Sequence, residues 1–185
     1  MSALLSNPAI RDAVVPISVE TYHRMGKAGI IDQRTELIGG VILQKMIKSP
    51  LHTLIVKQLV SAIEAQLPAE LELRKEEPLT FSSSEPEPDI AIVQVGSYQP
   101  GANHPSTAQL VVEVAVSSEA IDRAKAAVYA EAQIPEYWIV LPSSKTIERF
   151  THPGEEGYGT NETFEFGNPI GSLPPLAIQV TLTTG

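Results

Sequence analysis

The stretch VVEVAVSSEAIDRAKAAVYAEAQIPEYWIV, residues 111–140, contains a strand, a helix and a second strand in succession. Residues 110–116 carry apolar side chains on both faces, which is typical of a central, buried strand. Residues 117–134 form the clearest helix of the chain, and residues 136–141 form the next strand. Glu113 stands in the middle of the first strand, where a carboxylate requires an explanation.

The rest of the chain predicts further helices and short strands. We expect a helix at 17–30, a hairpin around Gly39 and Gly40, a helix at 49–67, strands at 71–75, 79–81 and 90–95, a surface loop at 96–109, and a strand-rich tail at 146–182. Apolar residues at helical spacing give two helices an expected inner face: Leu51, Leu54, Ile55, Leu59 and Ile63 in helix 49–67, and Ile121, Ala124 and Val128 in helix 117–134. This order predicts a single domain over residues 1–185, an α/β fold with a mixed central sheet flanked by helices and with additional C-terminal strands.

Composition favours a soluble globular protein. The 185 residues are enough for one domain with a substantial core, and 43% apolar with 19% charged residues is ordinary. The chain has no cysteine, which excludes disulfides and thiolate metal ligands. The opening MSALLSNPAIRDAVVP lacks the pattern of a signal peptide, and no apolar run approaches the roughly 18 residues of a membrane span. We therefore expect a cytoplasmic protein without membrane association.

The charges are unevenly distributed along the chain. The formal net charge is −9, which argues against nonspecific coating of nucleic acid. Between Leu37 and Ile63, however, there is no acidic residue, while Lys45, Lys48 and Lys57 all occur there. These lysines are most simply a solvated face, and contact with DNA is the less favoured interpretation.

Three acidic residues occur where strands begin or run. Asp89 follows Pro88 and precedes the strand IAIV, Glu113 lies inside LVVEVAV, and Glu36 lies on the expected hairpin. A carboxylate buried in a strand is costly unless a cation compensates it. Converging carboxylates form the oxygen-rich site that Mg²⁺ or Mn²⁺ prefers, and Lys125 could supply a positive charge beside a phosphate.

These residues resemble the PD-(D/E)XK motif of the restriction-endonuclease-like superfamily. Pro88 and Asp89 match its first pair, and Glu113 begins the acid-x-lysine element. The sequence departs from the motif at Ala115, which stands where the lysine belongs.

The departure is itself similar to a bacterial endonuclease-like family in which the lysine has moved to the following helix, in the pattern Asp-x-x-Lys-x-x-x-Tyr. Asp122, Lys125 and Tyr129 match this pattern on one helix face. The segments TELIGGVI, EPDIAIV, LVVEVAVSS and DRAKAAVYAEAQIPEYWIV carry the resemblance, which covers roughly residues 17–150.

The resemblance implies a restriction-endonuclease-like fold and Mg²⁺- or Mn²⁺-dependent hydrolysis of a nucleic acid, with DNA expected. It implies Asp89 and Glu113 as metal ligands and Lys125 as the catalytic lysine. It also places Glu36 as a third acid at or beside the metal, and it implies a homodimer. His52 matches a family histidine that could bind phosphate or water, with Asp122 and Tyr129 in support.

Simpler interpretations stay open for the same residues. Asp89 could be a turn residue before a strand, and Glu113 with Lys125 could form a purely structural buried ion pair. In the second case the protein would be a catalytically silent nucleic-acid-binding or homodimeric interaction protein on the same scaffold. A metal-dependent hydrolase of another phosphorylated substrate is a further alternative.

Overall fold

The computed structural model describes residue 9 and residues 13–97 and 103–183. The expectations for the N-terminal segment, for the middle of the 96–109 loop and for the full 1–185 domain therefore extend beyond the described residues. The elements, in chain order, are α2 (Val19–Lys27), β1 (Thr35–Ile38), β2 (Val41–Gln44), α3 (Pro50–Glu64), β3 (Leu71–Lys75), β4 (Ile90–Gln94), β5 (Leu110–Val114), α4 (Glu119–Glu131), β6 (Glu136–Leu141), β7 (Thr146–Gly154), β8 (Gly157–Glu165), β9 (Ile170–Gly171) and β10 (Gln179–Val180). Within this part of the chain, no helix combines the length and apolar composition needed to cross a bilayer.

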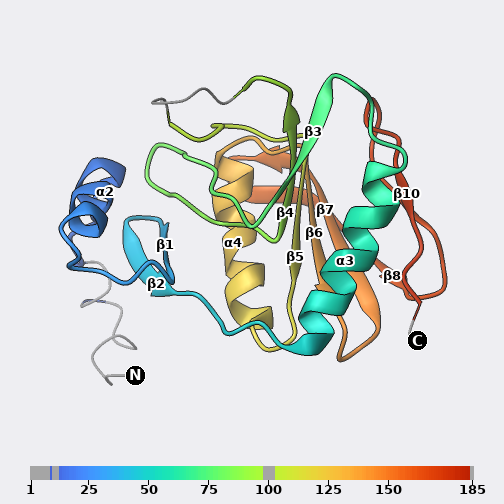
Figure 1. Cartoon of the computed structure of the whole chain (residues 1–185), viewed down its shortest axis with the longest axis horizontal. Coiled ribbons are helices and arrows are strands. Elements are labelled where there is room, and N and C mark those ends of the chain that lie inside the picture. Colours follow the sequence, from blue (N-terminus) through green and yellow to red (C-terminus); the bar gives the residue numbers. More distant parts are fainter. Residues whose placement is uncertain (1–8, 10–12, 98–102, 184–185) are drawn as a thin grey trace.

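A six-stranded mixed sheet forms the centre of the molecule, in the order β3-β4-β5-β6-β7-β8. Strands β5 and β6 are parallel and are joined through α4, while the other neighbours are antiparallel. Figure 1 shows α3 and α4 on opposite sides of this sheet. The expected mixed α/β fold, with helices flanking the sheet and strands added at the C-terminal end, is confirmed.

The α3 side of the sheet is a hydrocarbon core. Alternate residues of the central strands, such as Val112 and Trp138, belong to one apolar cluster with Ile55 and Leu59 of α3. The buried face of α3 is centred on His52, so Leu54, expected on the inner stripe, points away and is 52% exposed. Leu51, at the edge of that face, is also exposed, at 47%.

The α4 side of the sheet overturns the expected inner stripe of its helix. Ile121 and Ala124 are exposed and Val128 is only partly buried. The face that α4 turns inward instead carries Asp122, Lys125, Tyr129 and Ala130. Apolar periodicity failed here because the inward face holds charged groups, which find partners on the sheet.

The β1–β2 hairpin is held beside the segment that leads to Asp89. Its Gly39–Gly40 turn has φ of +55° and +74°, which suits the two-residue turn of a twisted hairpin. At Gly40 a Cβ would lie 2.4 Å from Pro16 Cβ, so no larger residue fits. Backbone hydrogen bonds in both directions between Leu37 and Glu85 fasten the hairpin.

The strand expected at Leu79–Phe81 does not form. These residues do make backbone contacts, since Leu79 N–H donates to Pro86 and Phe81 N–H donates to Ser84. The opposing segment contains Pro86 and Pro88, which have no N–H to donate, so a continuous ladder is impossible.

Candidate active site

Glu113 reaches the α4 side of the sheet because it alternates along β5 with Val112 and Val114, which face α3. Its Oε1 accepts hydrogen bonds from Lys125 Nζ at 3.0 Å and from the Tyr129 hydroxyl at 3.2 Å. Its Oε2 accepts from the backbone N–H of Asp89 at 3.2 Å. Both oxygens of this buried carboxylate are therefore engaged.

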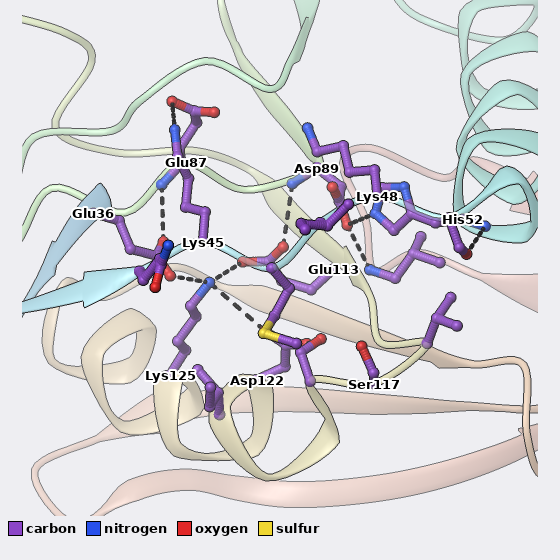
Figure 2. Close-up of a pocket in the computed structure, with 18 residues that line it drawn as sticks. Glu36, Lys45, Lys48, His52, Glu87, Asp89, Glu113, Ser117, Asp122 and Lys125 are labelled. Carbon is purple, nitrogen blue, oxygen red and sulfur yellow. Dashed lines mark hydrogen bonds and ion pairs between the residues drawn. The ribbon is translucent and has the colours of Figure 1, made fainter. Parts of the chain in front are cut away.

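Lys125 is the centre of an acidic cluster. Its Nζ lies 2.9 Å from Glu36 Oε1, 3.0 Å from Glu113 Oε1 and 3.6 Å from Asp122 Oδ1. Figure 2 shows the lysine extending from α4 between Glu36 and Glu113. Ser118 donates to the other oxygen of Asp122, which holds that carboxylate at the start of the helix.

The electrostatics of this cluster keep the lysine charged. Burial acts to lower the pKa of Lys125, but the charges of Glu113, Glu36 and Asp122 outweigh it and raise that pKa above its ordinary value. Burial raises the pKa of Glu113 well above its usual range, with Lys125 opposing and the other acids reinforcing the shift. Burial likewise raises the pKa of Asp122. Negative charge is therefore under-compensated here.

Asp89 lies directly before β4 and is fixed from two sides. Its Oδ2 accepts from the Val114 backbone N–H at 2.8 Å and lies 2.9 Å from His52 Nε2. An ionised carboxylate only accepts hydrogen bonds, so His52 donates from Nε2. The other ring nitrogen, Nδ1, is buried and has no hydrogen-bond partner among the described residues. His52, expected to bind phosphate or water, thus contacts Asp89.

A cavity of about 90 Å³, large enough for several water molecules, opens over these side chains. Of the predicted site residues, Glu36, His52, Asp89, Glu113, Asp122 and Lys125 line it (Figure 2). Tyr129 is fully buried behind Glu113 and supports it. Lys45, Lys48 and Glu87 also line the cavity, although sequence analysis did not place them there. The sequence signal that could have placed the two lysines there is the absence of acidic residues between Leu37 and Ile63.

The donor set suits a hard divalent cation. Asp89, directly before β4, and Glu113, on the adjacent strand β5, both open to the cavity, and both offer carboxylate oxygens of the kind that Mg²⁺ and Mn²⁺ prefer. In the described part of the chain, no three His, Asp or Glu side chains are already arranged as a metal site. Glu36, expected as a third acid, is paired with Lys125.

The fold and the family comparison together define a restriction-endonuclease-like protein. The chain belongs to the Uma2 family, described as "Putative restriction endonuclease", whose family model matches residues 19–185. Its structure is similar to that of "a putative nuclease belonging to DUF820 from Anabaena variabilis ATCC 29413", with a TM-score of 0.70, 16% identity, and coverage of 88% of this chain and 92% of that one. At this identity the similarity shows the fold. Comparison with curated proteins found no match.

Proposed function

We propose that this protein is a metal-dependent nuclease that hydrolyses phosphodiester bonds of a nucleic acid, with DNA as the expected substrate. One observation carries the proposal: four buried carboxylates, Glu36, Asp89, Glu113 and Asp122, surround a cavity at which Lys125 is the one buried lysine among the described residues. Such an excess of buried negative charge is stabilised by a cation. Membership of a family described as "Putative restriction endonuclease" gives this chemistry its expected reaction.

In this proposal Asp89 and Glu113 hold the metal, with Glu36 beside it. Bound Mg²⁺ or Mn²⁺ would polarise a phosphate oxygen and lower the pKa of a water molecule. Lys125, kept protonated by its acidic neighbours, supplies a fixed positive charge for the negative charge that develops on the scissile phosphate. Its raised pKa makes it a charge stabiliser and argues against a role as general base.

The remaining residues position these groups. His52 holds Asp89 through Nε2, and the Tyr129 hydroxyl holds Glu113. Asp122 lies about one helical turn before Lys125 on α4, and its carboxylate forms an ion pair with the Lys125 ammonium. A ligand set fixed in this way requires little rearrangement when a cation binds.

A catalytically silent nucleic-acid-binding protein is the second candidate. The observation that favours it is the completed ion-pair network, in which Lys125 satisfies Glu113 and Glu36 without a metal. In that case Glu113 and Lys125 would be structural. The homodimer and the cytoplasmic location stay predictions under either function.

Titration calorimetry with Mn²⁺ and Mg²⁺ separates the two candidates. The proposal expects binding by the wild type and its loss in both Asp89→Ala and Glu113→Ala. Glu148→Gln is the matched control, because Glu148 is an acid on β7 that does not line the cavity. Absence of binding at millimolar metal, with duplex DNA present, would favour the silent protein.

Cleavage assays then define the substrate. Duplex DNA, single-stranded DNA, RNA and a small phosphodiester are offered in competition, and Lys125→Ala is compared with the wild type. Loss of a charge stabiliser of this kind lowers kcat by about 10²–10³-fold, while metal affinity should change far less. A Lys125→Ala variant that cleaves at the wild-type rate would remove the lysine from the mechanism.

A further inference from the structure

The last residue of β2, Gln44, and the linker from there to α3 run along the mouth of the cavity. All of residues 44–49, with the sequence QKMIKS, line the space above Asp89 and Glu113. Two lysines in this linker flank two apolar residues. We call residues 44–49 the basic linker, and Figure 2 shows Lys45 and Lys48 on either side of the cavity.

Each lysine of the basic linker is paired with a carboxylate of the segment that leads to Asp89. Lys45 Nζ lies 2.7 Å from Glu87 Oε2, and Lys48 Nζ lies 2.8 Å from Glu76 Oε2. The Lys48–Glu76 side chains are 39% and 32% exposed, and the Lys45–Glu87 side chains 22% and 24%. Ion pairs accessible to water are weak, so a phosphate oxygen can replace either carboxylate.

The two residues between the lysines present apolar surface to solvent. Ile47 is 87% exposed and Met46 is 50% exposed. Nucleic acids combine charged phosphates with apolar base faces, and proteins that bind single strands or unstacked steps use cations and apolar side chains together. A small phosphodiester without a base offers no comparable partner for Ile47.

We propose that the basic linker is the substrate-binding element and that it selects a polynucleotide over a small phosphodiester; this rests on the proposed function. Lys45 and Lys48 bind two backbone phosphates that flank the scissile one, in exchange for Glu87 and Glu76. Ile47 packs against a base or sugar between them. Glu87 and Glu76 thereby act as competitors that weaken nonspecific binding of nucleic acid.

The test is the affinity of the full chain for a fluorescent oligonucleotide, duplex or single-stranded, with chelator present so that cleavage cannot occur. Lys45→Ala and Lys48→Ala should each weaken binding and reduce the slope of log K against log salt by about 0.9 for a duplex or about 0.7 for a single strand. Ile47→Ser should weaken binding and leave the slope unchanged. Glu87→Gln and Glu76→Gln should strengthen binding.

Lys57→Ala is the matched control, since Lys57 is an exposed lysine of α3 that does not line the cavity. Thermal melting of each variant checks that it is folded. Unchanged affinity and salt slope in both linker variants, an equal effect of Lys57→Ala, or no oligonucleotide binding by the wild type would overturn the inference.

Together with the calorimetry and cleavage assays proposed above, these measurements distinguish the linker role from the proposed function. Linker-dependent binding without metal uptake would support the linker role and contradict the nuclease. If Lys45→Ala and Lys48→Ala bound metal and cleaved nucleic acid as the wild type does, the result would support the nuclease and contradict the linker role.

Discussion

The two faces of the central sheet each bury a glutamate, and they satisfy it in different ways. On the α3 side, Glu136 accepts from Trp138 Nε1 and from the Leu173 backbone N–H, both at 2.7 Å. On the α4 side, Glu113 is bonded to the ammonium of Lys125 and opens onto the cavity. Burial raises the pKa of both carboxyls. A buried acid with a raised pKa is therefore insufficient evidence of an active site.

What distinguishes the faces is the charge around each glutamate. Glu136 has two N–H donors and the charge of Arg149 nearby, in an enclosed position. Glu113 shares one cation with Glu36 and Asp122 and lies close to Asp89. On the α3 side the charge of Glu136 is balanced by its neighbours. On the α4 side there is an excess of carboxylate that a bound cation would neutralise.

The largest loss of stability should come from Lys125→Met, which removes the positive charge that Glu36, Glu113 and Asp122 share on the α4 side of the sheet. Breaking a buried pair by removing one partner costs about 3–5 kcal/mol. The loss should be greatest at neutral pH, because the pKa of Glu113 is already raised and rises further without the lysine. Acid protonates the cluster and removes the penalty, so the difference in free energy of unfolding should shrink as pH falls toward about 4.5.

Denaturant unfolding at pH 7 and pH 5, in the presence of chelator, measures this difference. Lys57→Met serves as the control, because it removes an exposed lysine from the other helix. A Lys125→Met variant with the same loss at both pH values would show that the cluster does not depend on the lysine for its charge balance.

Glu136→Gln should cause the second-largest loss of stability, even though it removes a buried negative charge. A glutamine has one acceptor oxygen, so its amide group would face the N–H of either Trp138 or Leu173. Leaving a buried donor unsatisfied costs about 1–3 kcal/mol. Thermal unfolding measures the loss, and metal binding should be unchanged since Glu136 does not line the cavity. A stabilised variant would mean that burial of the charge outweighs its hydrogen bonds.

Glu113→Gln should cost less stability, roughly 1 kcal/mol or less, because removing one charge from the excess of carboxylate offsets the hydrogen bonds that the amide cannot accept. It should also change how the stability depends on pH. A carboxyl whose pKa is raised in the folded state contributes stability below its unfolded value of 4.5, and that contribution is lost as pH rises through the folded pKa. Without this group, the free energy of unfolding should fall less between pH 5 and pH 7. An unchanged pH profile, measured by denaturant titration without metal, would contradict the raised pKa.

Sequence reasoning predicted the sheet and the convergence of Asp89 and Glu113, because both depend on local signals. The apolar run around Glu113 and the Pro88–Asp89 pair mark strands that carry a misplaced charge, and the structure brings them together. The helix spacing of Asp122, Lys125 and Tyr129 was informative for the same reason.

The inner face of α4 could not be predicted from hydrophobic periodicity. Ile121 was expected inside and is 38% exposed, while the charged Lys125 is buried. A charged inward face is stable only with partners from distant strands, and periodicity within one helix contains no information about them. The position of Lys45 and Lys48 beside the cavity could not be predicted either, since their pairing with Glu87 and Glu76 depends on the tertiary fold.

The smallest effect should come from Arg123→Ala, which compares the two faces of α4 itself. Arg123 is two residues before Lys125 and forms an ion pair with Glu148 of β7 at 2.8 Å, yet its side chain is 46% exposed. Water and salt screen such a pair, so its loss should cost about 0.2–1 kcal/mol and should diminish at high salt. Denaturant unfolding at two salt concentrations measures this. Arg123 and Lys125 lie on the same helix. If Arg123→Ala lowered the free energy of unfolding as much as Lys125→Met, the loss in both variants would come from weaker helix formation and not from the burial of Lys125 among carboxylates.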